Sequence, residues 1–228
     1  MNQSVKTGGY LSSSVGKKLV LAVTGLLLFG FVIGHMLGHL QMFAGPDKYN
    51  SYAKMLKDLG PVLWVIRFVL AVIFLAHVGT AIRVTMENRK ARPVGYYKYG
   101  TNVASYASRT MIMSGMLVLA FLVYHLLHFT AGVTNPEYHD FKDSLGRADV
   151  YKMFVTAFLN PAVLVSYIVS VFLLCFHLSH GLSSLFQTFG ANSPKLDPKL
   201  KGGALLISVL IFIGYASVPL AVAAGVIK

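Results

Sequence analysis

Five long apolar segments constrain the fold of this 228-residue chain more than any other feature. A helix needs about 20 mainly apolar residues to cross the hydrocarbon core of a membrane. The segments that meet this requirement lie at about 19–43, 62–86, 111–133, 162–186 and 203–226. They predict an all-α, polytopic membrane helix bundle with five transmembrane helices, formed by a single domain over residues 1–228.

The composition agrees with a membrane protein and excludes several soluble classes. Hydrophobic residues make up 55% of the chain and charged residues only 12%, whereas soluble domains carry about 25% charged residues. A water-soluble enzyme, a disordered chain and a nucleic-acid-binding protein are therefore excluded, despite the net charge of +12. The single cysteine, Cys175, allows no internal disulfide, and no C-x-x-C-H haem-attachment motif or paired-cysteine zinc motif is present.

Prolines and connectors predict where the helices begin and end. Pro61 follows Gly60 and Pro161 follows Asn160, which places a proline at the first position of the second and fourth spans. Pro219 is expected to kink or end the fifth span. The connectors near 48–59 and 148–159 are predicted to hold short amphipathic helices that lie on the membrane interface.

The basic residues favour one orientation in the membrane. With the N-terminus inside, twelve basic and two acidic residues fall inside, and eight basic and six acidic residues fall outside. The positive-inside rule then predicts a cytoplasmic N-terminus and an external C-terminus. A basic inner face is also suited to dock a soluble partner or anionic lipid headgroups.

Histidines inside the apolar segments are the main functional signal, because ionisable groups are costly in hydrocarbon and usually have a role there. The first four spans carry a histidine in their C-terminal half, whereas the fifth carries none. Successive helices run in opposite directions, so two histidines are expected at an outer level and two at an inner level. The outer pair is His35 with His125, and the inner pair is His77 with His177.

Such pairs are suited to bis-histidine ligation of b-type haem, in which one imidazole binds each face of the iron. Two haems at different depths would carry electrons across much of the bilayer. Nearby glycines, including Gly115 upstream of His125, would let a planar group approach the backbone or let helices pack closely. One alternative is that the histidines only form hydrogen bonds between helices. A zinc site is another, although no carboxylate or thiolate joins them at either level.

Four sequence stretches resemble a known family. The runs SSVGKKLVLAVTG, HMLGHLQMF, YHLLHF and FHLSHGLSSLFQTFG are similar to the cytochrome b membrane-anchor subunit of succinate dehydrogenase or fumarate reductase. The closer similarity is to the single-chain, five-helix, two-haem type, which occurs in bacteria that often use menaquinone. The resemblance extends from about Ser12 to the fifth span.

The resemblance implies a cofactor and ligand set. Two haem b groups would be bound, with His77 and His177 as iron ligands of the proximal haem and His35 and His125 as those of the distal haem. Some relatives have asparagine where this chain has His39 and His180. Contacts to haem propionates or quinone are expected from a group of polar residues: Lys17, Arg67, Arg83, Arg109, His39, His128 and His180.

The resemblance also implies partners and a function. The chain would lie in the bacterial inner membrane, hold a flavoprotein subunit and an iron–sulfur subunit on its cytoplasmic face, and pass electrons between the iron–sulfur subunit and membrane quinone. The dicarboxylate chemistry of the enzyme would belong to those subunits, and no catalytic residue is assigned in this chain. Two alternatives remain open. One is the cytochrome b subunit of another quinone-linked complex, such as formate dehydrogenase or hydrogenase, and the other is a transporter with a histidine proton relay.

Overall fold

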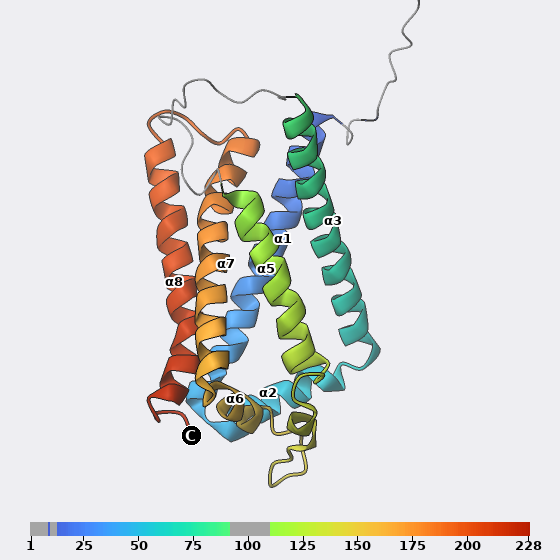
Figure 1. The fold of residues 1–228 in the computed structure, drawn as a ribbon, viewed down its shortest axis with the longest axis vertical. Helices are drawn as coiled ribbons and strands as arrows, with labels where there is room; N and C mark the ends of the chain where they lie inside the picture. Colours follow the sequence, from blue (N-terminus) through green and yellow to red (C-terminus); the bar gives the residue numbers. More distant parts are fainter. Residues whose placement is uncertain (1–8, 10–12, 92–109) are drawn as a thin grey trace, which may run out of the picture.

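The computed structural model describes Gly9, residues 13–91 and residues 110–228, and these residues form a helical bundle (Figure 1). Five helices are long and apolar enough to cross a membrane, which confirms the predicted number. They are α1 (Ser14–Leu40), α3 (Pro61–Ala91), α5 (Met111–His125), α7 (Pro161–Thr188) and α8 (Asp197–Ala223). The described residues contain no β-strand, only an isolated bridge between Lys142 and Ala148. The chain is therefore an all-α, multi-pass membrane protein.

Short elements complete the ends of the bundle. A 3-10 helix, η2 (Gln41–Ala44), continues α1, and a π-helix, η3 (Leu126–Thr130), continues α5. A second 3-10 helix, η4 (Pro136–Asp140), follows in the next connector. The two expected amphipathic helices are present as α2 (Pro46–Asp58) and α6 (Val150–Phe158).

The helix ends follow local sequence signals more closely than they follow hydropathy. Pro61 and Pro161 open α3 and α7, as predicted, and the Asn160 side chain accepts a hydrogen bond from the Ala162 amide at 2.9 Å. In α1 the helix begins at Ser14, before the apolar run, because the Ser13 hydroxyl caps the Gly16 amide. Of the two expected effects of Pro219, ending the fifth span is excluded, since α8 continues to Ala223 with Pro219 buried inside it.

The spanning helices alternate in direction, and α2, α6 and the C-terminus gather at one end of the bundle (Figure 1). Helix α7 contacts α8, α5 and α1, whereas α3 packs mainly on α1 and over a shorter stretch on α5. None of the residues of α3 is buried. Helix α3 therefore lies at the edge of the bundle, with α8 at the opposite edge.

A polar network closes the end of the bundle that carries α2 and α6. We call α2, α6 and the connector 141–149 the cap. Asn50 of α2 is 1% exposed, and its amide nitrogen donates to Asp149 at 3.0 Å while its oxygen accepts from the Tyr151 amide at 3.0 Å. Arg147 donates to Asp143 at 2.6 Å and to Asp47 at 2.7 Å. These bonds join α2 to the start of α6 across about 100 residues of sequence.

Candidate functional site

The histidines of α1 and α5 meet near the cap. The ring centres of His35 and His125 are 5.9 Å apart, and the ring planes are inclined by 87°. Imidazoles on the two sides of one metal ion place their ring centres roughly 6 Å apart, since each metal–nitrogen bond is about 2 Å long. The Nδ1 atom of His125 lies 3.5 Å from the Tyr167 hydroxyl. The spacing of this outer pair therefore fits two ligands of one metal ion.

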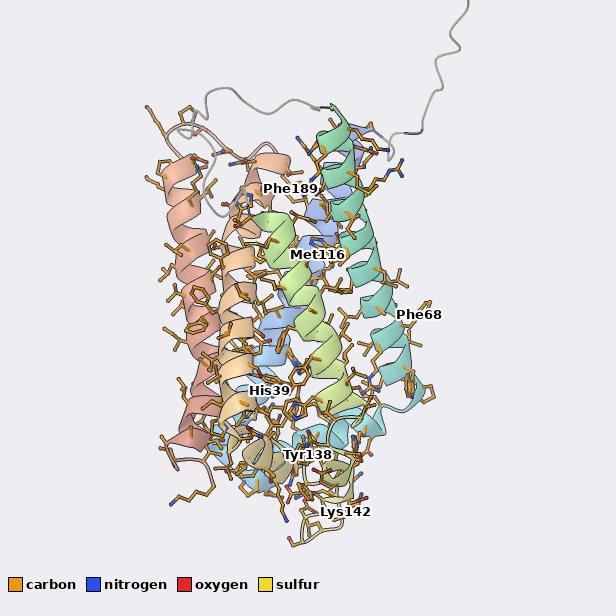
Figure 2. The ribbon with its side chains drawn as sticks, viewed as in Figure 1. His39, Phe68, Met116, Tyr138, Lys142 and Phe189 are labelled. Atoms are coloured by element: carbon orange, nitrogen blue, oxygen red, sulfur yellow. The ribbon has the colours of Figure 1, made fainter. Side chains whose placement is uncertain are left out.

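His39 lies one helical turn after His35 and closes the outer level toward the cap. Its Nδ1 atom is hydrogen-bonded to the Tyr49 hydroxyl at 2.8 Å, and its Nε2 atom lies 3.1 Å from Nε2 of His35. The ring of Phe154, in α6, lies 4.8 Å from the His39 ring. Figure 2 shows His39 near the end of the bundle that also carries Tyr138. Burial raises the pKa of Tyr49, so its hydroxyl stays protonated and able to donate to His39.

His128 is placed in the protein interior rather than near solvent. It lies in the π-helix η3, is 0% exposed, and forms a hydrogen bond through Nδ1 with the Tyr167 hydroxyl at 3.0 Å. The rings of Tyr124 and Phe129 stack on it. Its Nε2 atom has no hydrogen-bond partner among the described residues. Tyr167 thus lies between His128 and the ligand candidate His125, and π-helical turns of this kind occur often at functional sites.

The inner histidines are each held by a hydroxyl from a neighbouring helix. Nδ1 of His77, in α3, lies 3.0 Å from the Thr24 hydroxyl of α1. Nδ1 of His177, in α7, lies 3.1 Å from the Ser114 hydroxyl of α5.

Glycine follows each of these hydroxyl residues and allows the ring to approach the helix. A Cβ atom on Gly25 would lie 3.4 Å from Cε1 of His77, and a Cβ atom on Gly115 would lie 3.4 Å from Cε1 of His177. Gly115 therefore faces the inner histidine of α7, although the sequence suggested a role beside His125. Four further glycines have open space where a side chain would be: Gly30, Gly34, Gly79 and Gly181. Gly38 instead packs against Tyr52 of α2.

The separation of the two levels follows from residue spacing on α1 and α5. Thr24 precedes His35 by eleven residues, and Ser114 precedes His125 by eleven residues. Eleven residues advance a helix by about 16 Å and rotate it only about 20° past three full turns. Each of these helices therefore presents a hydroxyl to the inner level and a histidine to the outer level on nearly the same face.

The charged side chains expected near propionates or quinone have other partners. Lys17, 7% exposed, and Arg83 both form ion pairs with Glu87, which joins α1 to α3 at the end opposite the cap. The guanidinium of Arg67 lies 5.1 Å from the centre of the Trp64 ring. Arg109 lies outside the described residues. His180 lies near Lys201 at the start of α8.

Sequence reasoning did not identify the hydroxyl groups that hold the histidines, namely Thr24, Ser114, Tyr49 and Tyr167. For the first two a signal is present, because Thr24-Gly25 and Ser114-Gly115 are each followed, after nine residues, by a histidine. No comparable pattern marks the two tyrosines. Across residues 13–91 and 110–228, no cluster of three or more histidine, cysteine, aspartate or glutamate side chains is suited to hold a metal ion.

Comparison with known proteins gives one match. The family model described as "Succinate dehydrogenase/Fumarate reductase transmembrane subunit" matches residues 87–216, which is more than half of the chain and includes α5, α7 and part of α8. No curated protein and no solved structure matches the chain.

Proposed function

Because the chain belongs to the family of transmembrane subunits of succinate dehydrogenase and fumarate reductase, we propose that it carries electrons between an iron–sulfur subunit and membrane quinone through two b haems. The observation that carries the proposal is the approach of His35 and His125, which come from α1 and α5, at the outer level. We assign His77 and His177, each bonded to a hydroxyl of a neighbouring helix, to the inner pair.

The residues of this chain would perform three tasks. The four histidines would offer a neutral imidazole nitrogen to iron, which requires each ring to be oriented by its second nitrogen. The surrounding apolar helices would keep water away, and the cap would cover the outer level through Tyr49 and Phe154. When bound, the haems would accept and donate single electrons and so connect the two levels.

We place the N-terminus in the cytoplasm of a bacterium, with the flavoprotein and iron–sulfur subunits on that face. The end of the bundle opposite the cap carries Lys18, Arg89, Lys90, Lys195 and Lys199 as well as the Lys17–Glu87–Arg83 ion pairs. This basic surface supports the inner assignment through the positive-inside rule and offers a docking face for soluble partners.

We place the quinone, of the menaquinone type, near the outer level. An apolar groove of about 280 Å³ lies there between α1 and α3, lined by Phe31, Val65, Ile66, Val69, Leu70 and Ile73. Phe31 stacks on His35 with ring centres 5.3 Å apart. The groove would hold part of the isoprenoid tail, and His39 and Arg67 are the polar groups available to the quinone oxygens.

A spectroscopic experiment on the purified complex tests the proposal. The reduced-minus-oxidised spectrum and the pyridine haemochrome assay should give two haem b per chain. Replacing His35 or His125 with alanine should remove the same haem, and replacing His77 or His177 should remove the other. The matched control is H139A, since His139 is exposed in the cap-side connector.

Several results would contradict the proposal. A colourless complex would favour a transporter, and nickel or molybdenum in the complex would favour a hydrogenase or formate dehydrogenase. Loss of one common haem in the His35 and His77 variants would contradict the pairing, because these residues lie about 16 Å apart in depth by the helical rise along α1.

A further inference from the structure

Two pairs of helices repeat the same arrangement around the inner histidines. In the first pair, Thr24 and Gly25 of α1 contact His77 of α3; in the second, Ser114 and Gly115 of α5 contact His177 of α7. The hydroxyl-to-Nδ1 distances are 3.0 and 3.1 Å, and a Cβ atom added at either glycine would lie 3.4 Å from Cε1 of the ring. The same arrangement occurs in two separate helix pairs, which indicates a shared role.

Each of the two hydroxyls has a carbonyl of its own helix within hydrogen-bonding distance, which favours one direction for the bond to histidine. Thr24 donates its hydroxyl hydrogen to the Val20 carbonyl at 2.6 Å, and Ser114 donates its hydrogen to the Met111 carbonyl at 3.1 Å. A hydroxyl has one hydrogen to donate, so each oxygen is left to accept. With the hydroxyl hydrogen on the carbonyl, the hydrogen bond to the histidine runs from its Nδ1–H group to the hydroxyl oxygen.

The direction of the bond selects one tautomer of each ring. A neutral imidazole with its hydrogen on Nδ1 carries its lone pair on Nε2, which is the nitrogen then able to bind a metal. A hydrogen-bond acceptor on the other ring nitrogen also fixes ring orientation and increases the basicity of the ligand. The adjacent glycine lies against the same ring, where an added Cβ atom would be in van der Waals contact with Cε1.

We infer that Thr24 and Ser114 are positioning residues that hold His77 and His177 in the Nδ1–H form, which would leave Nε2 to bind the iron of the inner haem. The inference rests on the proposed function, because it assigns a role toward the haem that these histidines would bind. It adds two residues outside the ligand set and a chemical role for each. The two stretches with the pattern Thr/Ser-Gly-x9-His then have the same two tasks. Each supplies a positioning hydroxyl to the inner level, and its histidine, His35 or His125, is a proposed ligand at the outer level.

The experiment compares S114A and T24V with S208A in the full complex. Ser208 is a matched control because it is 2% exposed, like Ser114, and its hydroxyl bonds only to the Ala204 carbonyl of its own helix. The measurements are the haem content and the midpoint potential of each haem by redox titration, both of which are independent of turnover. Loss of an orienting partner typically weakens metal binding about 10- to 100-fold.

The midpoint potential of the inner haem should rise in S114A and T24V. Without the acceptor the histidine is a weaker donor, so the ferric inner haem should be destabilised more than the ferrous form and its potential should rise. A tenfold differential effect corresponds to about 59 mV for one electron. The outer haem should keep its wild-type potential in every variant, and S208A should keep both wild-type potentials. S114T and T24S retain a hydroxyl and should keep the wild-type potential of the inner haem.

Other outcomes separate this inference from the proposed function. Two haems per chain with unchanged potentials in both S114A and T24V would overturn the inference and leave the proposed function intact. A shift confined to the outer haem, or the same shift in S208A, would also overturn it. A wild-type complex without haem would overturn the proposed function itself. If S114A fails to accumulate, T24V and the two conservative variants still decide the question.

Discussion

Replacing Asn50 with alanine should open the cap, because this single buried amide joins α2 to the start of α6. The side chain is 1% exposed and donates to Asp149 at 3.0 Å and, more weakly, to Asp143 at 3.5 Å. Its oxygen accepts from the Tyr151 amide at 3.0 Å. The N50A variant leaves that buried amide without a partner and removes the bridge to the carboxylates.

The size of the effect follows from these lost contacts. A hydrogen bond to a charged group contributes about 1.5–3 kcal/mol, and a buried N–H left without a partner costs about 1–3 kcal/mol. Contributions at one site are not additive, so the free energy of opening the cap should fall by about 3 kcal/mol. Since every 1.4 kcal/mol is a factor of ten, opening should become about 100-fold more frequent.

Hydrogen exchange followed by mass spectrometry measures this opening directly in the purified complex. Exchange of the amides of residues 141–151 should accelerate about 100-fold in N50A, while those of α7 should be unchanged. The control is N135A, whose side chain makes a solvent-exposed bond to Glu137 at 3.3 Å. An acceleration of less than about fivefold in residues 141–151 would refute the reasoning. Because Tyr49 and Phe154 belong to the cap and contact His39, the spectrum of the proposed outer haem should change as well.

Two further predictions concern the same end of the molecule. Y167F should lower the free energy of unfolding of the complex by about 1–3 kcal/mol, because the buried His128 loses its hydrogen bond. The control is Y124F, which lies in the same ring cluster. Equal stability of the two variants would contradict the assignment. Burial alone would raise the pKa of Asp143, but hydrogen bonds from Arg147 and the Leu145 amide lower it below its ordinary value of 3.8 on balance. Its contribution to cap stability is therefore complete above that value and lost as the pH falls through the lowered pKa. Exchange in residues 141–151 should accelerate over this acidic range in wild type and show no such step in D143N.

Hydropathy was sufficient for the number of spanning helices but not for their ends. An apolar window reports where a helix crosses hydrocarbon, whereas the helix itself ends where capping and hydrogen bonding stop. Helix α1 therefore begins five residues before its predicted span, at the Ser13 cap, and α3 continues to Ala91, past the ion pairs of Glu87. Pro219 remains inside α8 because lost helix bonds are tolerated in membrane helices when neighbours satisfy the backbone.

The sequence also predicts two levels of histidines, because depth along a helix depends only on residue count and direction. It led as well to their pairing as a prediction, since helices that run the same way bring the same end to the same level. It could not assign what each ring touches. The spanning helices are apolar on all sides, so the pattern does not determine how each helix is rotated about its axis.

That rotation was decided by the tertiary packing. Gly115 faces His177 of α7, and His128 is buried among aromatic rings. The hydroxyls of Thr24 and Ser114 reach the inner histidines only because α1 packs on α3 and α5 packs on α7. Helix length and hydropathy are properties of one segment, so they can be derived from its sequence. A contact between side chains depends on the position and rotation of two helices together.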